Sequence, residues 1–290
     1  MGFRTVVIDS KSKIELSLNY LVIRSEEEKR IHISEISILV IMSTAVSMTA
    51  AALCELNKQK VRIIFCDEKY QPYGELMPYT QGFRNSKRIK EQIFWDGQMS
   101  EEIWKCIVKE KIMNQYALLV KRGFKDDSKL LLDYANEVLP GDKTNREGQA
   151  AKVYFNRVFG PNFRRGDELN FYNKCLNYGY SIILSSMNRE INILGYLTQL
   201  GVCHCNEYNP YNLGCDLMEP YRPFVDELVI NIKKDSIHWK HCVSDILNKH
   251  VKIDEKNTTV GTSIPIYVKS CTDSLTENIN MVKFPSEYEL

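Results

Sequence analysis

Hydrophobic residues in the first 80 positions form short runs that alternate or cluster β-branched side chains, with polar turns between the runs. This pattern is typical of β-strands. Four such runs are predicted to form a meander, at residues 3–9, 13–18, 20–24 and 29–33. A further strand is predicted at residues 61–66, before a polar stretch that contains Pro72 and Gly74. We therefore expect a small β-rich domain over residues 1–84.

Residues 36–54 contain no charged side chain, and the run approaches the roughly 20 residues needed to cross a bilayer. Ser43 and Thr44 interrupt it, however, and five of its positions are Ser or Thr. We interpret residues 36–42 as a buried strand and Ser43 or Thr44 as the cap of an Ala-rich helix that continues to about Asn57. We expect no membrane span. The start of the chain also lacks the basic residues and long apolar core of a secretory signal.

From Lys87 onward the hydrophobic positions recur every three or four residues among charged ones, which predicts amphipathic helices. Helix breaks are expected at Gly123 and at residues 140–142, 159–162 and 208–210. The periodicity is lost from about Cys271 to the end, which predicts a mobile tail. The expected fold class is α+β, with a small N-terminal β-rich domain at residues 1–84 and a larger, mostly α-helical C-terminal domain at residues 85–290.

Composition is that of a globular protein without a dominant charge. The chain has 290 residues, of which 44% are hydrophobic and 26% charged, and 38 Lys and Arg oppose 37 Asp and Glu for a net charge of +1. This mix excludes general disorder and a histone-like protein, which would need a clear cationic excess to bind phosphates. Nine cysteines are too few for a disulfide scaffold and cannot all pair, so we expect a reducing, cytoplasmic setting.

Three acidic residues and one histidine are candidates for metal chemistry. Asp216 and Glu219 are three positions apart, which places both carboxylates on one side of a helical turn. His204 precedes them, and Glu147 stands near the start of a predicted amphipathic helix. Carboxylates with one imidazole suit Mg²⁺ or Mn²⁺, and such an ion assists phosphodiester cleavage or transesterification. A solvated helix face or a capping carboxylate explains the same spacing, because the chain has 37 acidic residues.

A zinc site at Cys203, His204 and Cys205, with Cys215 nearby, is a competing hypothesis. Adjacent residues converge poorly on one tetrahedral ion, and the chain has no C-x-x-C pair. Buried free thiols fit this cluster better.

Local groups of basic residues are candidates for contact with DNA phosphates, although the total charge balances. They are Arg84, Lys87, Arg88, Lys121 and Arg122. Successive cations can follow a phosphate backbone, but they also serve to keep helices soluble. The chain has no P-loop, no G-x-G-x-x-G after a strand and no G-x-S-x-G elbow, so nucleotide hydrolysis and serine-hydrolase chemistry have no support.

Four blocks of the sequence, taken in order, resemble the family of CRISPR-associated spacer-acquisition integrases. The blocks are R-E-G-Q-A-A-K-V-Y-F around Glu147, L-N-Y-G-Y-S at residues 176–181, the isolated His204, and D-L-M-E-P-Y-R-P-F-V-D at residues 216–226. The resemblance extends over nearly the whole chain, because a small β domain followed by a larger helical domain is also the layout of that family.

The resemblance implies a catalytic metal site with Mg²⁺ or Mn²⁺ held by Glu147, His204 and Glu219, and with Asp216 as the neighbouring acidic ligand. The last ligand is Asp in some members and Glu here, which lengthens its reach by one methylene. Supporting roles, such as holding a ligand or a phosphate, are implied for three further residues in the matching blocks: Tyr154, Asn177 and Arg222.

The resemblance also implies a reaction and partners. In that family a 3′-hydroxyl on a short DNA fragment attacks a phosphodiester at the border of a CRISPR repeat, and the repeat strand leaves with its own 3′-hydroxyl. Two sites act on opposite strands of double-stranded DNA. The implied assembly is a heterohexamer, in which two homodimers, formed through the β-rich domain, flank a dimer of a small partner subunit.

Two further hypotheses remain open from the sequence. One is a divalent-metal nuclease of the same fold that acts in repair or transposition without CRISPR partners. The other is a DNA-binding scaffold whose acidic cluster is only structural.

Overall fold

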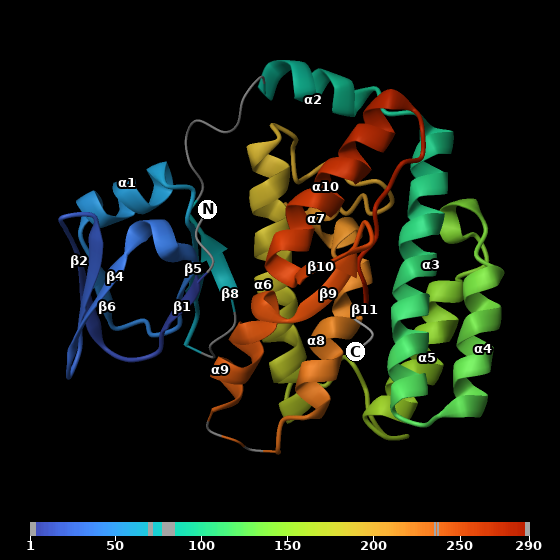
Figure 1. Ribbon diagram of the computed structural model, residues 1–290, viewed down its shortest axis with the longest axis horizontal. Coiled ribbons are helices and arrows are strands. Elements are labelled where there is room, and N and C mark those ends of the chain that lie inside the picture. The colour runs from blue at the N-terminus through green and yellow to red at the C-terminus, as the bar shows by residue number, and fades with distance from the viewer. Residues whose placement is uncertain (1–3, 69–71, 77–84, 235, 237, 288–290) are drawn as a thin grey trace. The chain divides into compact units, whose positions relative to one another are not determined.

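The computed structural model describes residues 4–68, 72–76, 85–234, 236 and 238–287 (Figure 1). The chain divides into two compact units, Met1–Thr80 and Gln81–Leu290. The predicted domain boundary at residue 84 lies outside the described residues.

The first unit is β-rich, as the sequence predicts. Its strands and single α-helix are β1 (Arg4–Ile8), β2 (Ser12–Ser17), β3 (Tyr20–Arg24), β4 (Glu28–His32), β5 (Ile36–Ile41), β6 (Val46–Met48), α1 (Ala50–Lys58), β7 (Arg62–Cys66) and β8 (Pro72–Glu75). A short 3₁₀ turn, Ile33–Glu35, joins β4 to β5.

These strands form two four-stranded sheets, with the orders β1-β5-β7-β8 and β4-β3-β2-β6. The predicted meander is confirmed for β2, β3 and β4, which pair antiparallel with their sequence neighbours. It is wrong for β1, which pairs parallel with β5. The strand β5 is buried along most of its length and has a parallel neighbour on each side. A strand apolar on both faces belongs inside a sheet, and β1 supplies the second neighbour.

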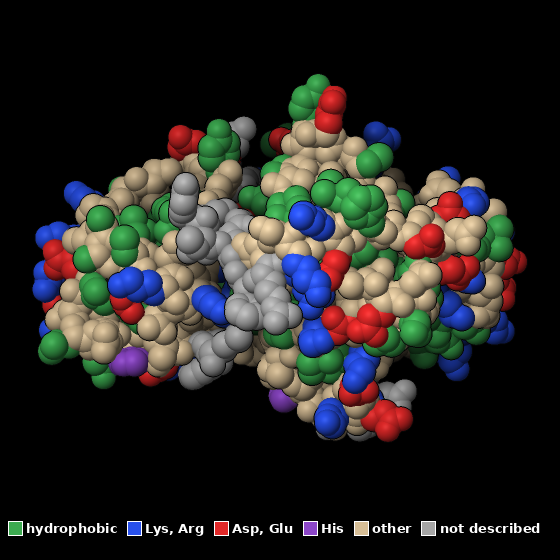
Figure 2. Space-filling view, turned by 90° about the horizontal axis from the view of Figure 1, so that it is seen from above, with side chains coloured by type: hydrophobic (Ala, Val, Ile, Leu, Met, Phe, Trp, Pro, Cys, Tyr) green, Lys and Arg blue, Asp and Glu red, His purple; other side chains and the backbone are tan. Residues whose placement is uncertain are grey.

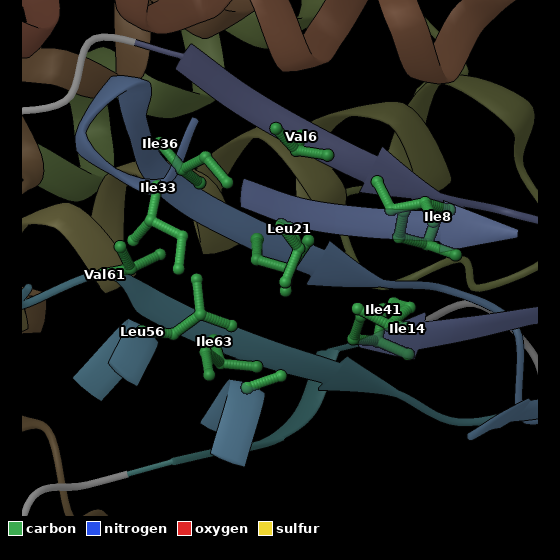
Figure 3. Packing of buried hydrophobic residues seen from close by; sticks show 13 residues of the cluster. Val6, Ile8, Ile14, Leu21, Ile33, Ile36, Ile41, Leu56, Val61 and Ile63 are labelled. Carbon is green, nitrogen blue, oxygen red and sulfur yellow. The ribbon is translucent and has the colours of Figure 1, made fainter. Parts of the chain in front are cut away.

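Buried side chains from both sheets and from α1 form one core in this unit (Figure 3). Ile14 and Leu21 of one sheet and Ile63 of the other are fully buried within it. The core explains why the β-branched runs alternate, since each strand directs every second side chain toward it.

The uncharged segment after residue 36 divides into a strand and a helix, but the helix begins later than predicted. The strand is confirmed as β5. The cap is Thr49 and not Ser43 or Thr44: its side chain accepts a hydrogen bond from Ala52 N at 3.3 Å. Residues 46–48 stay extended because β6 pairs parallel with β2. Among the described residues, no helix combines the length and apolar character that crossing a membrane requires.

The second unit is mainly helical, as predicted. Its helices are α2 (Asn85–Ile93), α3 (Gly97–Lys121), α4 (Lys125–Asn136), α5 (Arg146–Val158), α6 (Phe171–Ile193), α7 (Asn212–Leu217), α8 (Arg222–Ile230), α9 (Trp239–Ser244) and α10 (Val260–Glu277). Short 3₁₀ turns occupy Pro140–Asp142, Glu219–Tyr221 and Asp245–Asn248. The long helix α3 packs against α4, α5 and α8, and runs beside α4 and α5 in Figure 1.

The end of the chain is ordered through residue 287, so the predicted mobile tail is wrong there. The helix α10 buries Cys271 and continues to Glu277. The Oγ atoms of Ser270 and Ser274 then accept hydrogen bonds from Lys283 N and Met281 N, each at 3.0 Å. Beyond these bonds β11 (Ser286–Glu287) pairs antiparallel with β9 (His250–Ile253), which also pairs antiparallel with β10 (Lys256–Thr259).

The glycine of the L-N-Y-G-Y-S block allows α6 to approach its neighbours closely. A Cβ atom on Gly179 would lie 2.4 Å from Val225 Cγ1 of α8 and 2.9 Å from Val243 Cγ1 of α9. We expect Gly179→Ala to lower the free energy of unfolding by about 1–3 kcal/mol through overpacking, as measured by urea denaturation. Val225→Ala should recover part of that loss in the double variant, and a double variant less stable than either single one would contradict the packing explanation.

Candidate active site

The buried carboxylate of Asp216 organises the loop that carries His204. Asp216, in α7, is fully buried. Its Oδ2 accepts hydrogen bonds from the backbone N–H groups of Val202 at 2.6 Å and Cys203 at 2.9 Å, and its Oδ1 from His204 N at 3.2 Å. Gly201 allows this close approach, since a Cβ there would lie 2.7 Å from Asp216 Oδ2.

The same carboxylate fixes the imidazole of His204. Nδ1 of His204 is hydrogen-bonded to Asp216 Oδ1, and this bond raises the pKa of His204 above its ordinary value. A proton on Nδ1 leaves Nε2 with a free lone pair for a ligand. The ring also lies edge-on to Trp104 of α3, with centroids 5.6 Å apart. The sequence places Asp216 among the metal ligands. In the structure its oxygens serve the loop and His204, and its role as a ligand stays a prediction.

Glu147 and Glu219 meet at a buried lysine. Lys111 Nζ, from the middle of α3, lies 2.5 Å from Glu147 Oε1 and 2.5 Å from Glu219 Oε2. On the other side of Glu219, Arg222 Nε donates to Oε1 at 2.8 Å. Burial opposes ionisation of Glu219, but Arg222 and Lys111 outweigh it and lower the pKa of Glu219 to about 2. Burial likewise disfavours the charge on Lys111, yet the two glutamates raise its pKa overall, so the site holds a cation between two carboxylates.

The start of α5 presents Glu147 in its first turn. Asp142 Oδ1 accepts a hydrogen bond from Arg146 N at 2.8 Å, and its Oδ2 accepts one from Glu147 N at 3.1 Å. Asn145, the N-cap, adopts a left-handed conformation with φ 52° and accepts a hydrogen bond from Gly148 N at 3.2 Å. A Cβ on Gly148 would lie 2.6 Å from Asn145 Oδ1, which accounts for the glycine after Glu147. This cap leaves the Glu147 side chain free to turn toward α3.

The structure thus brings together most of the predicted site. Glu147 and Glu219 contact the same ammonium group. Both carboxylates also help to raise the pKa of His204, so the two glutamates and the histidine interact electrostatically. Within the described residues, no three His, Cys, Asp or Glu side chains are close enough together to hold a metal ion. Two carboxylates and one imidazole nevertheless suit a hard divalent ion as donors. The two carboxylates already flank one positive charge, that of Lys111.

Sequence reasoning missed Lys111 and Asp142. Lys111 is one of many cations in a charged amphipathic stretch, and only its contacts with Glu147 and Glu219 distinguish it. Asp142 had a usable signal: it precedes a helix start by four residues and follows Pro140 and Gly141, which is typical of a helix N-terminus.

The supporting residues of the matching blocks contact other parts of the site. Arg222 binds Glu219 as described. The Tyr154 hydroxyl donates to Asp226 Oδ2 at 2.9 Å, and Arg165 donates to Asn177 Oδ1 at 2.7 Å.

The predicted DNA-contacting residues have acidic or polar neighbours within the chain. Arg84 lies outside the described residues. Lys87 and Arg88 pair with Glu91, and Lys121 pairs with Glu227 at 2.6 Å. The face in Figure 2 likewise shows Lys and Arg side chains interspersed with Asp and Glu.

Arg122 contacts Asn231 Oδ1 at 3.5 Å. Phosphates would have to compete with these local contacts, and the DNA-binding role of Arg84, Lys87, Arg88, Lys121 and Arg122 stays a prediction.

A cavity of about 830 Å³ opens beside His204. Residues 199–210 form most of its wall, and Gln92, Ile93, Trp95, Ser100 and Asn212 complete it. Its polar groups are mostly amides and hydroxyls rather than cations.

The zinc hypothesis finds no support in the thiols. All nine cysteines are free, but Cys203 and Cys205 are exposed, so the expectation of buried thiols is wrong for these two. Burial raises the pKa of the Cys203 thiol to about 11 and also raises that of Cys215, whereas zinc binds the thiolate.

Known proteins resemble this chain in sequence and in fold. The family profile described as "CRISPR associated protein Cas1" matches residues 5–256. The CRISPR-associated endonuclease Cas1 of Neisseria meningitidis serogroup C (strain 8013) is 34% identical over 233 residues, which cover 80% of this chain and 76% of that protein. A casposase bound to integration product has a TM-score of 0.78 at 20% identity and covers 99% of this chain and 94% of its own. A Cas6-RT-Cas1–Cas2 complex has a TM-score of 0.74 at 17% identity, over 96% of this chain and 35% of that one.

Proposed function

Because this chain belongs to the family of CRISPR-associated protein Cas1, we propose that it is a DNA nuclease and integrase of CRISPR adaptation, which inserts short DNA fragments as new spacers at a repeat. The observation that carries the proposal is the meeting of Glu147 and Glu219, from separate parts of the helical unit, at one buried positive charge beside His204. Such a convergence of acidic side chains on a cation is what metal-assisted phosphoryl chemistry needs.

In this proposal Glu147, Glu219 and Nε2 of His204 hold Mg²⁺ or Mn²⁺. The ion supplies polarisation of the phosphoryl oxygen and neutralisation of charge on the leaving oxygen. Asp216 keeps Nε2 of His204 available by holding the proton on Nδ1. Arg222 keeps Glu219 ionised and oriented.

The proposed reaction is a transesterification at phosphorus. The 3′-hydroxyl of the incoming fragment loses its proton and forms a new P–O bond, while the bond to the repeat strand breaks and the leaving 3′-oxygen takes up a proton to become a 3′-hydroxyl. One phosphodiester replaces another, so the step needs no external energy source. Of the three proposed ligands only His204 lines the cavity of about 830 Å³, which is large enough to admit a nucleotide at a strand end beside the imidazole.

We propose double-stranded DNA as the substrate and a homodimer as the basic assembly, with a small partner subunit completing a heterohexamer. The support is the similarity in fold to a chain of a Cas6-RT-Cas1–Cas2 complex, together with the need for two sites to act on two strands. Nine free cysteines support a cytoplasmic setting.

The test is strand transfer of a labelled short duplex with free 3′-hydroxyls into a supercoiled plasmid. We expect joined products with Mn²⁺ or Mg²⁺ and none with EDTA, because the carboxylates need the ion to stabilise charge at phosphorus. A control duplex blocked by 3′-deoxy ends should bind without being joined. If the folded protein with its small partner bound DNA but neither joined nor cut it in either metal, the proposed function would be wrong.

A second candidate function is integration of a mobile element without CRISPR partners. The similarity in fold to a casposase bound to integration product favours it. The same assay separates the two functions: transfer that is independent of the small partner and of a repeat sequence in the plasmid indicates the second.

A further inference from the structure

Asp226 is a buried carboxylate that joins three helices of the second unit. It lies in α8 with 1% of its surface exposed. Tyr154 of α5 donates its hydroxyl hydrogen to Oδ2 at 2.9 Å, and Tyr180 of α6 donates to Oδ1. Both tyrosines are themselves buried. Two hydroxyl donors and one carboxylate therefore fix the mutual positions of α5, α6 and α8 at this point.

A carboxylate in this position is costly for the core. Burial raises the pKa of Asp226 to about 6, although the two tyrosines and the guanidinium groups of Arg165 and Arg222 oppose the shift. Apolar residues of similar volume often replace such buried charges without loss of stability. Stability alone therefore does not explain why this residue is acidic.

The network continues from Tyr180 to Glu219. The guanidinium of Arg222 lies over the Tyr180 ring, 4.5 Å from its centroid, and Arg165 also lies over the ring at 5.1 Å. From this stacked position Arg222 Nε donates to Glu219 Oε1 at 2.8 Å. The orientation of the Glu219 carboxylate thus depends on a guanidinium whose own place is set by the tyrosine that Asp226 holds.

We propose that Asp226 is a positioning residue for both acidic ligands: it orients Glu219 through Tyr180 and Arg222, and it anchors the helix of Glu147 through Tyr154. This inference deepens the proposed function and rests on it for the identity of the ligands. Tyr154 follows Glu147 by seven residues, which is two turns along the same face of α5. Fixing Tyr154 therefore fixes the direction from which Glu147 reaches Lys111.

Metal affinity of the complete chain is the first readout, measured by calorimetric titration with Mn²⁺. We expect Asp226→Asn to weaken Mn²⁺ binding by about 10-fold, the low end of the effect of removing a group bonded directly to a ligand, because Asp226 acts through Tyr180 and Arg222. An amide of the same size cannot accept from both tyrosines as the carboxylate does. Tyr180→Phe should weaken binding less, because the ring under Arg222 remains, whereas Tyr180→Leu should match Asp226→Asn.

A matched control separates positioning from the general effect of changing a buried carboxylate. Glu190 is also buried and lies in α6, where it pairs with Arg189 at 3.0 Å. Glu190→Gln should leave the Mn²⁺ affinity at the wild-type value even if it lowers stability. Circular dichroism and thermal melting show which variants are folded. If Asp226→Asn does not fold, Tyr180→Phe and Tyr180→Leu still test the order of the effects.

Crystal structures of the wild type and Asp226→Asn, both without metal, provide a second readout that does not depend on the proposed function. We expect the Arg222–Glu219 hydrogen bond to be lost or the Glu219 carboxylate to rotate in the variant. Unchanged Mn²⁺ affinity in folded Asp226→Asn, or an unchanged Glu219 orientation, would overturn the proposal. If the wild type binds no Mn²⁺, the proposed function fails, and the Glu219 orientation alone decides whether Asp226 is a positioning residue.

Discussion

We expect Glu147→Gln and His204→Ala each to lower the rate of strand transfer by at least about 10³-fold, equivalent to about 4 kcal/mol of transition-state stabilisation. This is the expected result if both side chains hold the ion. Glutamine at position 147 keeps the size of the side chain but removes the charge that faces Lys111. Alanine at position 204 removes the Nε2 donor and leaves Asp216 with its three backbone hydrogen bonds, so the loop stays in place.

The controls are chemically matched changes away from the site. Glu28→Gln alters an exposed carboxylate of the β-rich unit that pairs with Arg24 and Arg30, and His238→Ala alters an exposed histidine. Both should retain wild-type transfer. Initial rates with labelled duplex are compared at saturating Mn²⁺, and thermal melting confirms that each variant is folded. If Glu147→Gln and His204→Ala lowered stability but left transfer intact, the acidic cluster would be structural and the protein a DNA-binding scaffold.

The β-rich unit shows what a hydrophobic pattern does and does not specify. The pattern located β1 to β5 and β7, because the alternation or run of β-branched residues is a local property of each strand. It did not reveal that β1 pairs with β5 across the intervening hairpins, since pairing partners depend on which faces are buried in the finished sheet. The late start of α1 has the same cause: β6 is extended only because β2 lies beside it.

The candidate site likewise has residues that the sequence identifies and contacts that only the structure shows. Glu147, His204 and Glu219 could be named from the sequence because they stand in recognisable blocks. The contacts that hold them are visible only in the structure: Lys111 comes from a helix with an ordinary charged pattern, and Asp226, although it ends a recognisable block, acts through two tyrosines far away in sequence. The order at the end of the chain could not be predicted either. Ser270 and Ser274 hold that segment with single hydrogen bonds, which produce no hydrophobic periodicity in the sequence.

Lys111→Met is expected to make the folded protein dependent on metal. Methionine keeps the unbranched, apolar part of the lysine side chain but removes the ammonium group that separates Glu147 from Glu219. Removing one partner of a buried ion pair destabilises a protein by about 3–5 kcal/mol, because the remaining charge loses its compensation. We expect this loss in urea unfolding without metal, and we expect the pKa of Glu219 to rise because one of the two cations that lower it is gone.

Saturating Mn²⁺ should restore most of that stability, because an ion that binds only the folded state raises the free energy of unfolding. The increase grows with the logarithm of the ratio of the ion concentration to its Kd. The variant should also bind Mn²⁺ more tightly than the wild type, in which the ammonium group competes for the same two carboxylates. Lys105→Met, which removes a partly exposed partner of Glu102 on the same helix, controls for the loss of a lysine from α3. A Lys111→Met protein that is as stable as the wild type and indifferent to Mn²⁺ would show that the lysine does not lie where the ion binds. Stability regained through the ion would instead identify Lys111 as the internal cation that holds the two glutamates together until a metal replaces it.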